Sequence, residues 1–426
     1  MVAGQRNKLK RITMQEYQFV VVGLGYVGLP IAIRLATNFE DVIGFDIDIN
    51  RIHELKSYHD RTCEVLPEQL RRFSGLLTSK LIASDKPRIY IVTVPTPVNE
   101  NRRPDLSPLF NACTVISNVL TPSSIVVFES TVYPGCTMED CVPILEKSGL
   151  KLGLGFSVGY SPERINPGDK INKVNTINKI VSASDSKTLT ILQDFYSLVT
   201  DAQVVPATSI EVAEASKILE NTQRDVNIAL INEFEEICIK IGIDVYDVLS
   251  VASTKWNFHS YTPGLVGGHC IGVDPYYMID KSYKIGVVPE LMQSSRRVNE
   301  KKVVYIIDAI QRLIDKHHIR EIFILGLTFK PDCPDFRNSK ALEIVRIFIE
   351  KGIFVYYHDP FIDDLDPLES IENCAYVDQQ QLATRLRGTP LSVKLVDHSF
   401  YCSLNELELL TYYDIKNTKE LFYGKT

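Results

Sequence analysis

The sequence has no surplus of positive charge: its 426 residues include 46 lysines and arginines against 53 aspartates and glutamates, a formal net charge of −7. General nucleic-acid binders normally show a basic surplus, so the composition argues against that function class, although a basic pocket is still compatible with it. No hydrophobic run approaches a membrane span, and the polar, basic residues 1–16 are followed only by a strand-length apolar run. We therefore expect no membrane insertion and a flexible N-terminal tail over residues 1–16.

The nine cysteines include no CxxC pair, and the nearest two, Cys136 and Cys141, do not have common zinc-ligand spacing. This pattern predicts reduced thiols, no metal site and a cytoplasmic setting. With 45% hydrophobic and 23% charged residues, the chain has the composition of an ordinary globular protein. Its length predicts two or three domains.

A dinucleotide-binding pattern opens the first domain, which we predict over residues 17–210. The apolar run 18–22 leads into the glycine turn 23–28 (Gly-Leu-Gly-Tyr-Val-Gly), and a helix is expected directly after it. The glycines allow a tight turn, close approach of the backbone to a pyrophosphate and close packing of the helix on the strand. A second strand, 41–45, ends in Asp46, where a carboxylate binds the adenosine ribose hydroxyls and repels a 2′-phosphate. The pattern therefore predicts NAD rather than NADP.

Hydroxyl side chains follow two further predicted strands. Thr96 comes after the strand 88–94, and Ser130 and Thr131 come after the strand 124–128. Ligands of open parallel sheets lie beyond the carboxyl ends of the strands, so these side chains are placed to face a cofactor. Capping of the following helices is the alternative interpretation, and both can hold at once.

The strand 156–160 is followed by a loop that contains Glu163 and Arg164. Loops at this edge of a sheet often carry function, but an acid and a base side by side commonly form a solvated surface pair. Short strands near 179–182 and 203–206 are expected to complete the sheet.

A long helix is predicted over residues 210–241, because the run contains no proline or glycine. Glu214, Lys217 and Asn221 are spaced by three and four residues and therefore share one helix face. A substrate is one candidate partner for this polar stripe, and a plain surface stripe is the alternative. The helical middle domain, predicted over residues 211–315, is a natural dimer surface.

One cysteine stands in the glycine-rich segment 263–277. Cys270 follows a glycine run and precedes Asp274 by four residues. A thiol held by flexible backbone near a cation or a proton acceptor can attack a carbonyl carbon as the thiolate, so we interpret Cys270 as a nucleophile. A buried structural thiol is the commoner case for cysteine.

The last domain, predicted over residues 316–426, again contains strand, helix and strand, but it lacks the GxGxxG turn. Lys330, Asp335, Arg337 and Ser339 form a charged loop that suits a phosphorylated ligand other than the dinucleotide. Together these patterns predict the α/β class. Two Rossmann-like, doubly wound domains flank a helical middle domain and are joined by a long helix.

Several strings of sequence together resemble the UDP-glucose/GDP-mannose dehydrogenase family, from about residue 17 to 400. These strings are GLGYVGLP (23–30), VPTPVNENRRPDLS (94–107), ESTVYPGCT (129–137), YSPERINPGD (160–169), EASKILENTQRDVNIALINE (214–233), PGLVGGHCIGVDPYY (263–277) and GLTFKPDCPDFRNS (326–339). Within the family, the Gly-Gly-His-Cys-Ile loop is similar to the branch that acts on UDP-N-acetylhexosamines. SPERINPG and ENTQRD most resemble the UDP-N-acetylglucosamine 6-dehydrogenases of capsule and Vi-antigen type pathways.

The resemblance implies oxidation of the C6 alcohol of a nucleotide sugar to a carboxylate by two NAD⁺, through an aldehyde. Cys270 would add to this aldehyde to give a thiohemiacetal, and the second oxidation would leave a thioester for hydrolysis. Lys217 and Asn221 would stabilise the developing oxyanion.

Further roles are carried over from the family. Asp274 would hold water with Lys217, Glu163 would act as a base around thiohemiacetal formation or thioester hydrolysis, and Thr131 would hold water. The predicted cofactor contacts are Gly23, Gly25, Tyr26, Val27, Gly28, Asp46, Arg51, Thr96, Ser130, Thr131 and Lys330. The predicted substrate contacts are Glu163, Arg164, Lys217, Asn221, Tyr261, Gly264, Gly267, Lys330 and Arg337.

The resemblance favours UDP-GlcNAc as substrate, with UDP-GalNAc and UDP-ManNAc as its epimers, in the synthesis of surface polysaccharide precursors by a homodimer. The nearest alternative is a UDP-glucose 6-dehydrogenase. An alternative of another class is a non-catalytic NAD or sugar-nucleotide sensor. The sequence departs from the family pattern after about residue 361, and Glu300 stands where aspartate is usual.

Overall fold

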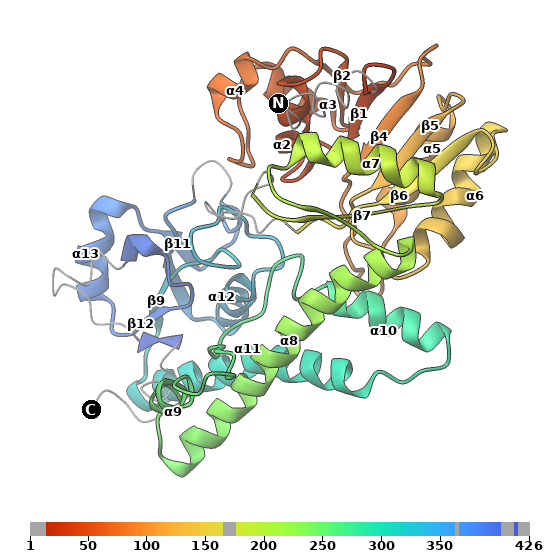
Figure 1. Cartoon of the computed structure of the whole chain (residues 1–426). Helices are drawn as coiled ribbons and strands as arrows, with labels where there is room; N and C mark the ends of the chain where they lie inside the picture. The colour runs from red at the N-terminus through yellow and green to blue at the C-terminus, as the bar shows by residue number, and fades with distance from the viewer. Residues whose placement is uncertain (1–13, 165–175, 363–365, 402–412, 416–426) are drawn as a thin grey trace. The chain divides into compact units, whose positions relative to one another are not determined.

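The computed structural model describes residues 14–164, 176–362, 366–401 and 413–415 (Figure 1). Its residues form two compact units: the first contains 1–220 and 276–286, and the second contains 221–275 and 287–426. Helix α8 (Ile210–Ile241) begins in the first unit and ends in the second. The helix has the same bounds as the one predicted from the sequence.

The first unit is built on an eight-stranded sheet. In spatial order its strands are β3 (Leu76–Thr78), β2 (Val42–Phe45), β1 (Gln18–Val22), β4 (Arg88–Val92), β5 (Ser124–Phe128), β6 (Phe156–Tyr160), β7 (Lys179–Ala183) and β8 (Val204–Pro206). All neighbours are parallel except β6 and β7, which are antiparallel. The central strands are continuous apolar runs because both faces of the sheet are covered.

Helices flank this sheet. They are α2 (Gly28–Ala36), α3 (Ile49–Lys56), α4 (Pro67–Arg71), α5 (Ser107–Ser117), α6 (Val142–Leu145) and α7 (Ser186–Val199), with a π-helical turn at Thr137–Cys141 and a 3-10 turn at Glu146–Ser148. Helices α2 and α7 contact each other, and α5 contacts α6; Figure 1 shows α7 lying across one face of the sheet. The tail predicted over residues 1–16 lies mostly outside the described residues, but Met14 is buried in the core of this unit.

The second unit contains a five-stranded, fully parallel sheet and several helices. The strand order is β11 (Cys374–Tyr376), β10 (Phe354–His358), β9 (Glu321–Leu325), β12 (Ser392–Lys394) and β13 (Tyr413–Asp414). The helices are α9 (Val245–Ala252), α11 (Glu290–His317), α12 (Lys340–Glu350) and α13 (Gln379–Gly388), besides the end of α8 and the start of α10 (Asp274–Lys284). Side chains of α11 share one hydrophobic core with β9, β10 and α12, so this long helix packs with the C-terminal sheet.

The predicted α/β class, with two open and mostly parallel sheets and a helical central region, is confirmed. The strands predicted at 18–22, 124–128 and 156–160 coincide with β1, β5 and β6. Within the described ranges, no helix combines the length and the apolar character that crossing a membrane would require.

Candidate active site

Three glycines shape the turn between β1 and α2. Gly23 has a φ of +93°, and a Cβ on Gly28 would lie 1.8 Å from the Gly23 carbonyl oxygen and 2.4 Å from Thr93 Oγ1. Glycine at both positions therefore lets α2 pack directly on the turn. A Cβ on Gly25 would meet no atom within 4 Å, so the space beside Gly25 is open. This open space fits the pyrophosphate of a dinucleotide. Thr93, whose hydroxyl donates to the Gly23 carbonyl at 2.8 Å, was not predicted from the sequence.

The carboxylate of Asp46 lies at the end of β2, beside the glycine turn. Its Oδ2 accepts a hydrogen bond from the backbone N of Leu24 at 2.8 Å, and its Oδ1 accepts one from the backbone N of Asp48 at 2.9 Å. The side chain is only half-buried, as are those of Tyr26 and Val27 in the turn. A half-exposed carboxylate at this place fits a ribose diol and disfavours a 2′-phosphate.

Arg51, another predicted cofactor contact, lies behind the turn in a cluster of charges. Its guanidinium donates to the Leu24 carbonyl at 2.9 Å and pairs with Glu54 and Asp60, each at 2.6 Å. Because only 2% of Arg51 is exposed, its observed role is to hold the turn in place from the protein side.

The predicted hydroxyl residues differ in what they contact. Ser130 donates to the carbonyl oxygen of Val94 at 2.7 Å, which joins the ends of β5 and β4 instead of capping a helix. The carbonyl of Thr96 accepts a hydrogen bond from the Tyr277 hydroxyl at 2.8 Å. The side chains of Thr96 and Thr131 are half-buried at this edge of the sheet.

Glu163 and Arg164 each have a side-chain partner of their own, so they are not simply a pair with each other. Glu163 is buried, and its Oε2 lies 3.0 Å from Nζ of Lys179 on β7. Arg164 pairs with Glu220 on α8 at 2.9 Å. Lys179 also contacts Glu129, and neither of these two residues was predicted for the site.

In the polar stripe on α8, Glu214 and Lys217 are buried and Asn221 is half-buried, which excludes the interpretation of a plain surface stripe. Glu214 accepts hydrogen bonds from the backbone N of Gly135 at 2.6 Å and of Thr137 at 3.0 Å. Burial raises the pKa of Glu214 to about 7. Only 7% of Lys217 is exposed, and among the described residues it has no ion-pair or hydrogen-bond partner. A buried ammonium without a counter-charge is costly, so Lys217 is suited to a ligand.

Asn221 and Asp274 contact each other directly. The Nδ2 of Asn221 donates to Asp274 Oδ2 at 2.5 Å, and Asp274 is buried at the first residue of α10. The carbonyl of Cys270 accepts hydrogen bonds from the backbone N of Val273 at 2.9 Å and of Asp274 at 2.8 Å. Cys270 therefore stands one turn ahead of α10, and it is half-buried.

The segment ahead of Cys270 is anchored at two glycines. Asn232 on α8 donates to the Gly264 carbonyl at 3.0 Å and accepts from the Gly264 backbone N at 2.9 Å. Asn338 donates through its side chain to the Gly268 carbonyl at 2.8 Å, and its own carbonyl accepts from the Gly268 backbone N at 3.1 Å. A Cβ on Gly268 would lie 2.5 Å from the Phe329 ring. The nucleophile loop and the loop 326–339 are thus docked on each other.

The charged loop 326–339 borders a cavity of about 150 Å³. Its lining residues are Gly264, Leu265, Thr328, Phe329, Lys330, Pro331, Lys340, Ala341, Leu395, Val396, Asp397 and Ile415. Lys330 brings a cation to this cavity. Arg337 is exposed, and its guanidinium and backbone N both bond the carboxylate of buried Asp335.

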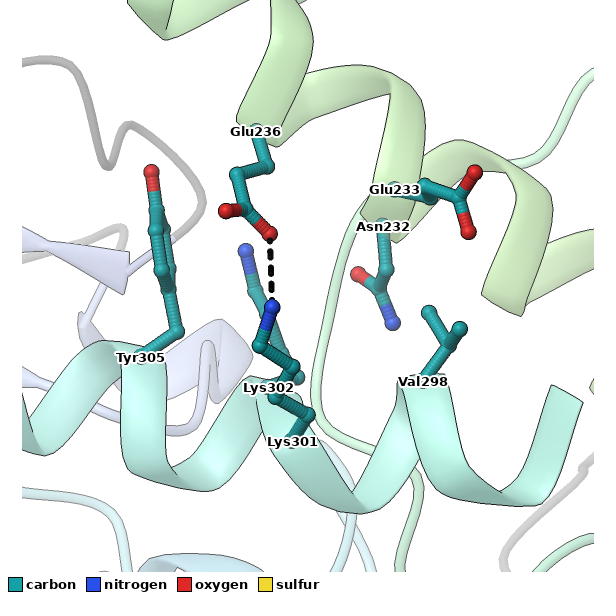
Figure 2. Close-up of a pocket in the computed structure, with 7 residues that line it drawn as sticks. All are labelled: Asn232, Glu233, Glu236, Val298, Lys301, Lys302 and Tyr305. Carbon is teal, nitrogen blue, oxygen red and sulfur yellow. Dashed lines mark ion pairs between the residues drawn. The ribbon is translucent and has the colours of Figure 1, made fainter. Parts of the chain in front are cut away.

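A second cavity, of about 160 Å³, lies between α8 and α11. Figure 2 shows its lining residues, which are Asn232, Glu233, Glu236, Val298, Lys301, Lys302 and Tyr305. Glu236 and Lys301 form an ion pair at 3.5 Å. None of these described residues was predicted for the site, but Asn232 belongs both to this cavity and to the anchor of Gly264.

The predicted site residues divide between the two units. The glycine turn, Asp46, Arg51, Thr96, Ser130, Thr131, Glu163, Arg164 and Lys217 belong to the first unit. Asn221, Tyr261, Gly264, Gly267, Cys270, Asp274, Lys330 and Arg337 belong to the second. Within the second unit, the structure brings Asn221 to Asp274 and docks the Cys270 loop on the loop that contains Lys330.

Comparison with known proteins gives matches along the chain. The NAD binding domain, the central domain and the UDP binding domain of the UDP-glucose/GDP-mannose dehydrogenase family match residues 17–200, 211–301 and 323–420. Protein CapL of Staphylococcus aureus is 49% identical over 80% of this chain and 81% of its own length. The UDP-N-acetyl-D-glucosamine 6-dehydrogenase of Pseudomonas aeruginosa is 46% identical over 83% of this chain and 85% of its own length.

Among solved structures, the UDP-D-ManNAc dehydrogenase of Pyrococcus horikoshii superposes with a TM-score of 0.82 at 28% identity, and the match covers 94% of this chain and 100% of that one. The resemblance inferred from the sequence strings and the predicted NAD cofactor are therefore confirmed. The chain belongs to the UDP-glucose/GDP-mannose dehydrogenase family and is an NAD-dependent nucleotide-sugar dehydrogenase.

Proposed function

We propose that the chain catalyses the four-electron oxidation of the C6 alcohol of a UDP-N-acetylhexosamine to the uronic acid, with UDP-GlcNAc as the favoured sugar. The observation that carries the proposal is the anchored nucleophile loop, in which Cys270 is half-buried between Gly268 and α10. Relatives named UDP-N-acetyl-D-glucosamine 6-dehydrogenase, at 46% and 44% identity, favour an acetamido sugar over glucose.

The first oxidation converts the alcohol to the aldehyde. NAD⁺, bound at the glycine turn, supplies the hydride acceptor for both oxidations. In our proposal the ammonium of Lys217 and the amide of Asn221 stabilise the negative charge that develops on the sugar oxygen. One hydrogen of the Asn221 amide is fixed by Asp274, which orients the other toward the substrate. Asp274 and Lys217 together hold the water that takes the alcohol proton.

The second oxidation uses Cys270. Its sulfur forms a bond to the aldehyde carbon, and the thiohemiacetal is oxidised to a thioester. Glu163 removes a proton from the water that attacks the thioester carbonyl, and the carbon–sulfur bond breaks to release the uronic acid and the thiol. The loop 326–339, with Lys330 and Arg337, holds the UDP part of the substrate.

We further propose that the enzyme is a cytoplasmic homodimer that supplies precursors of a surface polysaccharide. The dimer proposal is supported by exposed apolar side chains on α8, which are Leu230, Phe234, Ile237 and Ile241. Light scattering of the purified protein should give twice the mass of the single chain, and the single-chain mass would contradict the dimer.

The substrate test is NADH formation at 340 nm with UDP-GlcNAc, UDP-GalNAc, UDP-ManNAc, UDP-glucose and GDP-mannose, for the wild type and Cys270→Ser. We expect UDP-GlcNAc to give the highest kcat/KM and the variant to form no uronic acid. UDP-ManNAc is the second candidate, because the Pyrococcus horikoshii enzyme bears that name. Turnover of UDP-glucose alone would contradict the acetamido specificity. NAD binding without turnover of any of these sugars would favour the sensor.

A further inference from the structure

A buried cluster of charges lies directly behind Glu163 in the first unit. Lys179 is 0% and Glu129 is 1% exposed, and they come from β7 and from the residue after β5. The Nζ of Lys179 lies 2.6 Å from Glu129 Oε2 and 3.0 Å from Glu163 Oε2. The hydroxyl of Tyr196 on α7 donates to Glu129 Oε1 at 2.6 Å. One ammonium is therefore shared by two carboxylates.

Glu163 and Arg164 make further contacts beside the cluster. Its Oε1 accepts from the backbone N of Arg164 at 2.6 Å, whereas the guanidinium of Arg164 pairs with Glu220 at 2.9 Å. Among Glu129, Lys179 and Glu163, two buried carboxylates thus share one ammonium. Burial of two carboxylates side by side is costly, so we expect one of them to take up a proton more readily than an exposed carboxylate does.

The residues of the cluster differ in how readily they bind a proton. Burial raises the pKa of Glu129 to about 7, and the neighbouring Glu163 adds to this rise while Lys179 opposes it. Burial works against the ammonium of Lys179, but the two carboxylates outweigh burial and raise its pKa. Lys179 therefore stays charged, and a proton on Glu129 leaves the ammonium to Glu163 alone.

A simple structural ion pair would not need this arrangement. Lys302 and Glu235 in the second unit form a buried ion pair of one ammonium and one carboxylate. The cluster behind Glu163 differs from this pair, because its ammonium also contacts a second carboxylate. This second carboxylate is Glu163, a residue of the candidate site.

We propose that Lys179 and Glu129 are positioning residues that act on Glu163: Lys179 holds its carboxylate ionised and oriented, and Glu129 competes with it for the ammonium. Together they set the pH above which Glu163 accepts a proton from water during thioester hydrolysis. This inference rests on the proposed function, because only there does Glu163 act as a base.

The test is the pH profile of kcat for the preferred UDP-sugar, in the wild type, Lys179→Met, Glu129→Gln, Lys179→Arg and Glu163→Gln. Loss of the ammonium should move the acid limb to higher pH by about one unit, because an opposite charge favours the ionised carboxylate. Loss of the competing carboxylate in Glu129→Gln should move the limb to lower pH. Lys179→Arg keeps the charge and should keep the limb near its wild-type position.

Intact-protein mass spectrometry gives a second readout. At a pH between the acid limb of the wild type and that of Lys179→Met, the variants Lys179→Met and Glu163→Gln should accumulate the sugar thioester on Cys270, whereas the wild type should not. Lys302→Met is the matched control, since it also removes a buried lysine: it should lower the melting temperature without moving the limb. If Lys179→Met does not fold, the nearly isosteric variant Glu129→Gln tests the proposal alone. In that case, an acid limb that does not move to lower pH overturns the proposal.

The outcomes distinguish a failure of the proposed function from a failure of the present inference. A wild-type profile in Glu163→Gln would show that Glu163 is not the base, which contradicts that part of the proposed function. If Glu163→Gln abolishes the limb but the Lys179 and Glu129 variants shift it in the same direction or not at all, only the present inference is overturned.

Discussion

The two sheets of the protein contain the same turn, but the carboxylate beside the turn is half-exposed in the first sheet and buried in the second. Gly23 and Gly326 both have positive φ, of +93° and +86°. Each donates its backbone N–H to the last residue of the neighbouring strand, Phe45 at 2.8 Å and His358 at 2.9 Å. The next residue of each turn donates to the carboxylate after that strand, which is Asp46 in the first sheet and Asp359 in the second.

The second turn is filled from within the protein. Asp359 is fully buried, its Oδ2 accepts from the backbone N of Thr328 at 3.0 Å, and it lies 3.1 Å from Nε2 of His398. Although burial works to raise the pKa of Asp359, the hydrogen bond and charge of His398 hold it below its usual value. Thr328 takes the place that open Gly25 has in the first turn. The two turns therefore have the same backbone geometry, but only the first keeps its carboxylate, Asp46, and its glycine, Gly25, accessible to a dinucleotide.

The largest effect should come from closing the first turn. We expect Gly28→Ala to lose NAD-dependent turnover by more than about 100-fold and to lower the melting temperature, because its Cβ would lie 1.8 Å from a carbonyl oxygen and the helix must move. Gly388→Ala is the control in the second unit, since a Cβ there meets no atom within 4 Å. Full activity in Gly28→Ala would show that the turn is not packed as described.

The two carboxylates should respond differently to substitution. Asp46→Asn should raise KM for NAD by about 10- to 100-fold and narrow the preference over NADP, since a hydrogen bond to a charged group contributes about 1.5–3 kcal/mol. Asp359→Asn should leave KM for NAD unchanged and lower the melting temperature. Steady-state kinetics with both cofactors and thermal melts measure these effects. An equal change in KM for NAD in both variants would contradict the claim that only the first turn binds the dinucleotide.

Asn338 tests whether the nucleophile loop depends on its contact with the loop 326–339. Asn338→Gly keeps backbone freedom at a φ of +51° but removes the side-chain hydrogen bond to Gly268. We expect kcat to fall by about five-fold, the value of a hydrogen bond of about 1 kcal/mol, with KM for NAD unchanged. A rate of Cys270 alkylation by iodoacetamide equal to the wild type would argue against a positioning role for Asn338.

The last effect concerns the pH dependence of stability in the first unit, where no change in turnover is involved. The pKa of Glu214 is raised by burial to about 7, so the folded state binds its proton more tightly than the unfolded chain. This contribution is fully present below the usual carboxyl range and is lost as pH rises toward about 7, by at most about 3 kcal/mol. Glu214→Gln should flatten the fall in melting temperature between these pH values. An unchanged slope would contradict the raised pKa.

The sequence predicted those parts of the site that depend on local signals. Short stretches of sequence contain each of these parts, which are the glycine turn, Asp46, the helix stripe with Lys217 and the Cys270 loop. The family resemblance assigned their roles. The buried cluster was not predictable in this way, because Glu129 and Lys179 are 50 residues apart and meet only through the order of β5, β6 and β7. The anchors at Asn232 and Asn338 join equally distant segments.

The contacts of Arg51 within the protein were not predictable from the sequence. Its three nitrogens bond Leu24, Glu54 and Asp60, and its contact with the cofactor stays a prediction. Side-chain direction depends on the packing of α3 against the turn, which no local pattern reports. The three-residue strands β3, β11 and β12 were not predicted, whereas β8, which is equally short, was. Three residues contain too little periodicity to identify a strand reliably.

The most direct test of the central claim is the number of NADH molecules formed per sugar when UDP-GlcNAc is limiting. The account predicts two NADH and one equivalent of UDP-uronic acid, because the aldehyde stays on Cys270 until the second oxidation is complete. One NADH per sugar, with free aldehyde detected by mass spectrometry, would contradict the role of Cys270 and reduce the protein to a two-electron alcohol dehydrogenase.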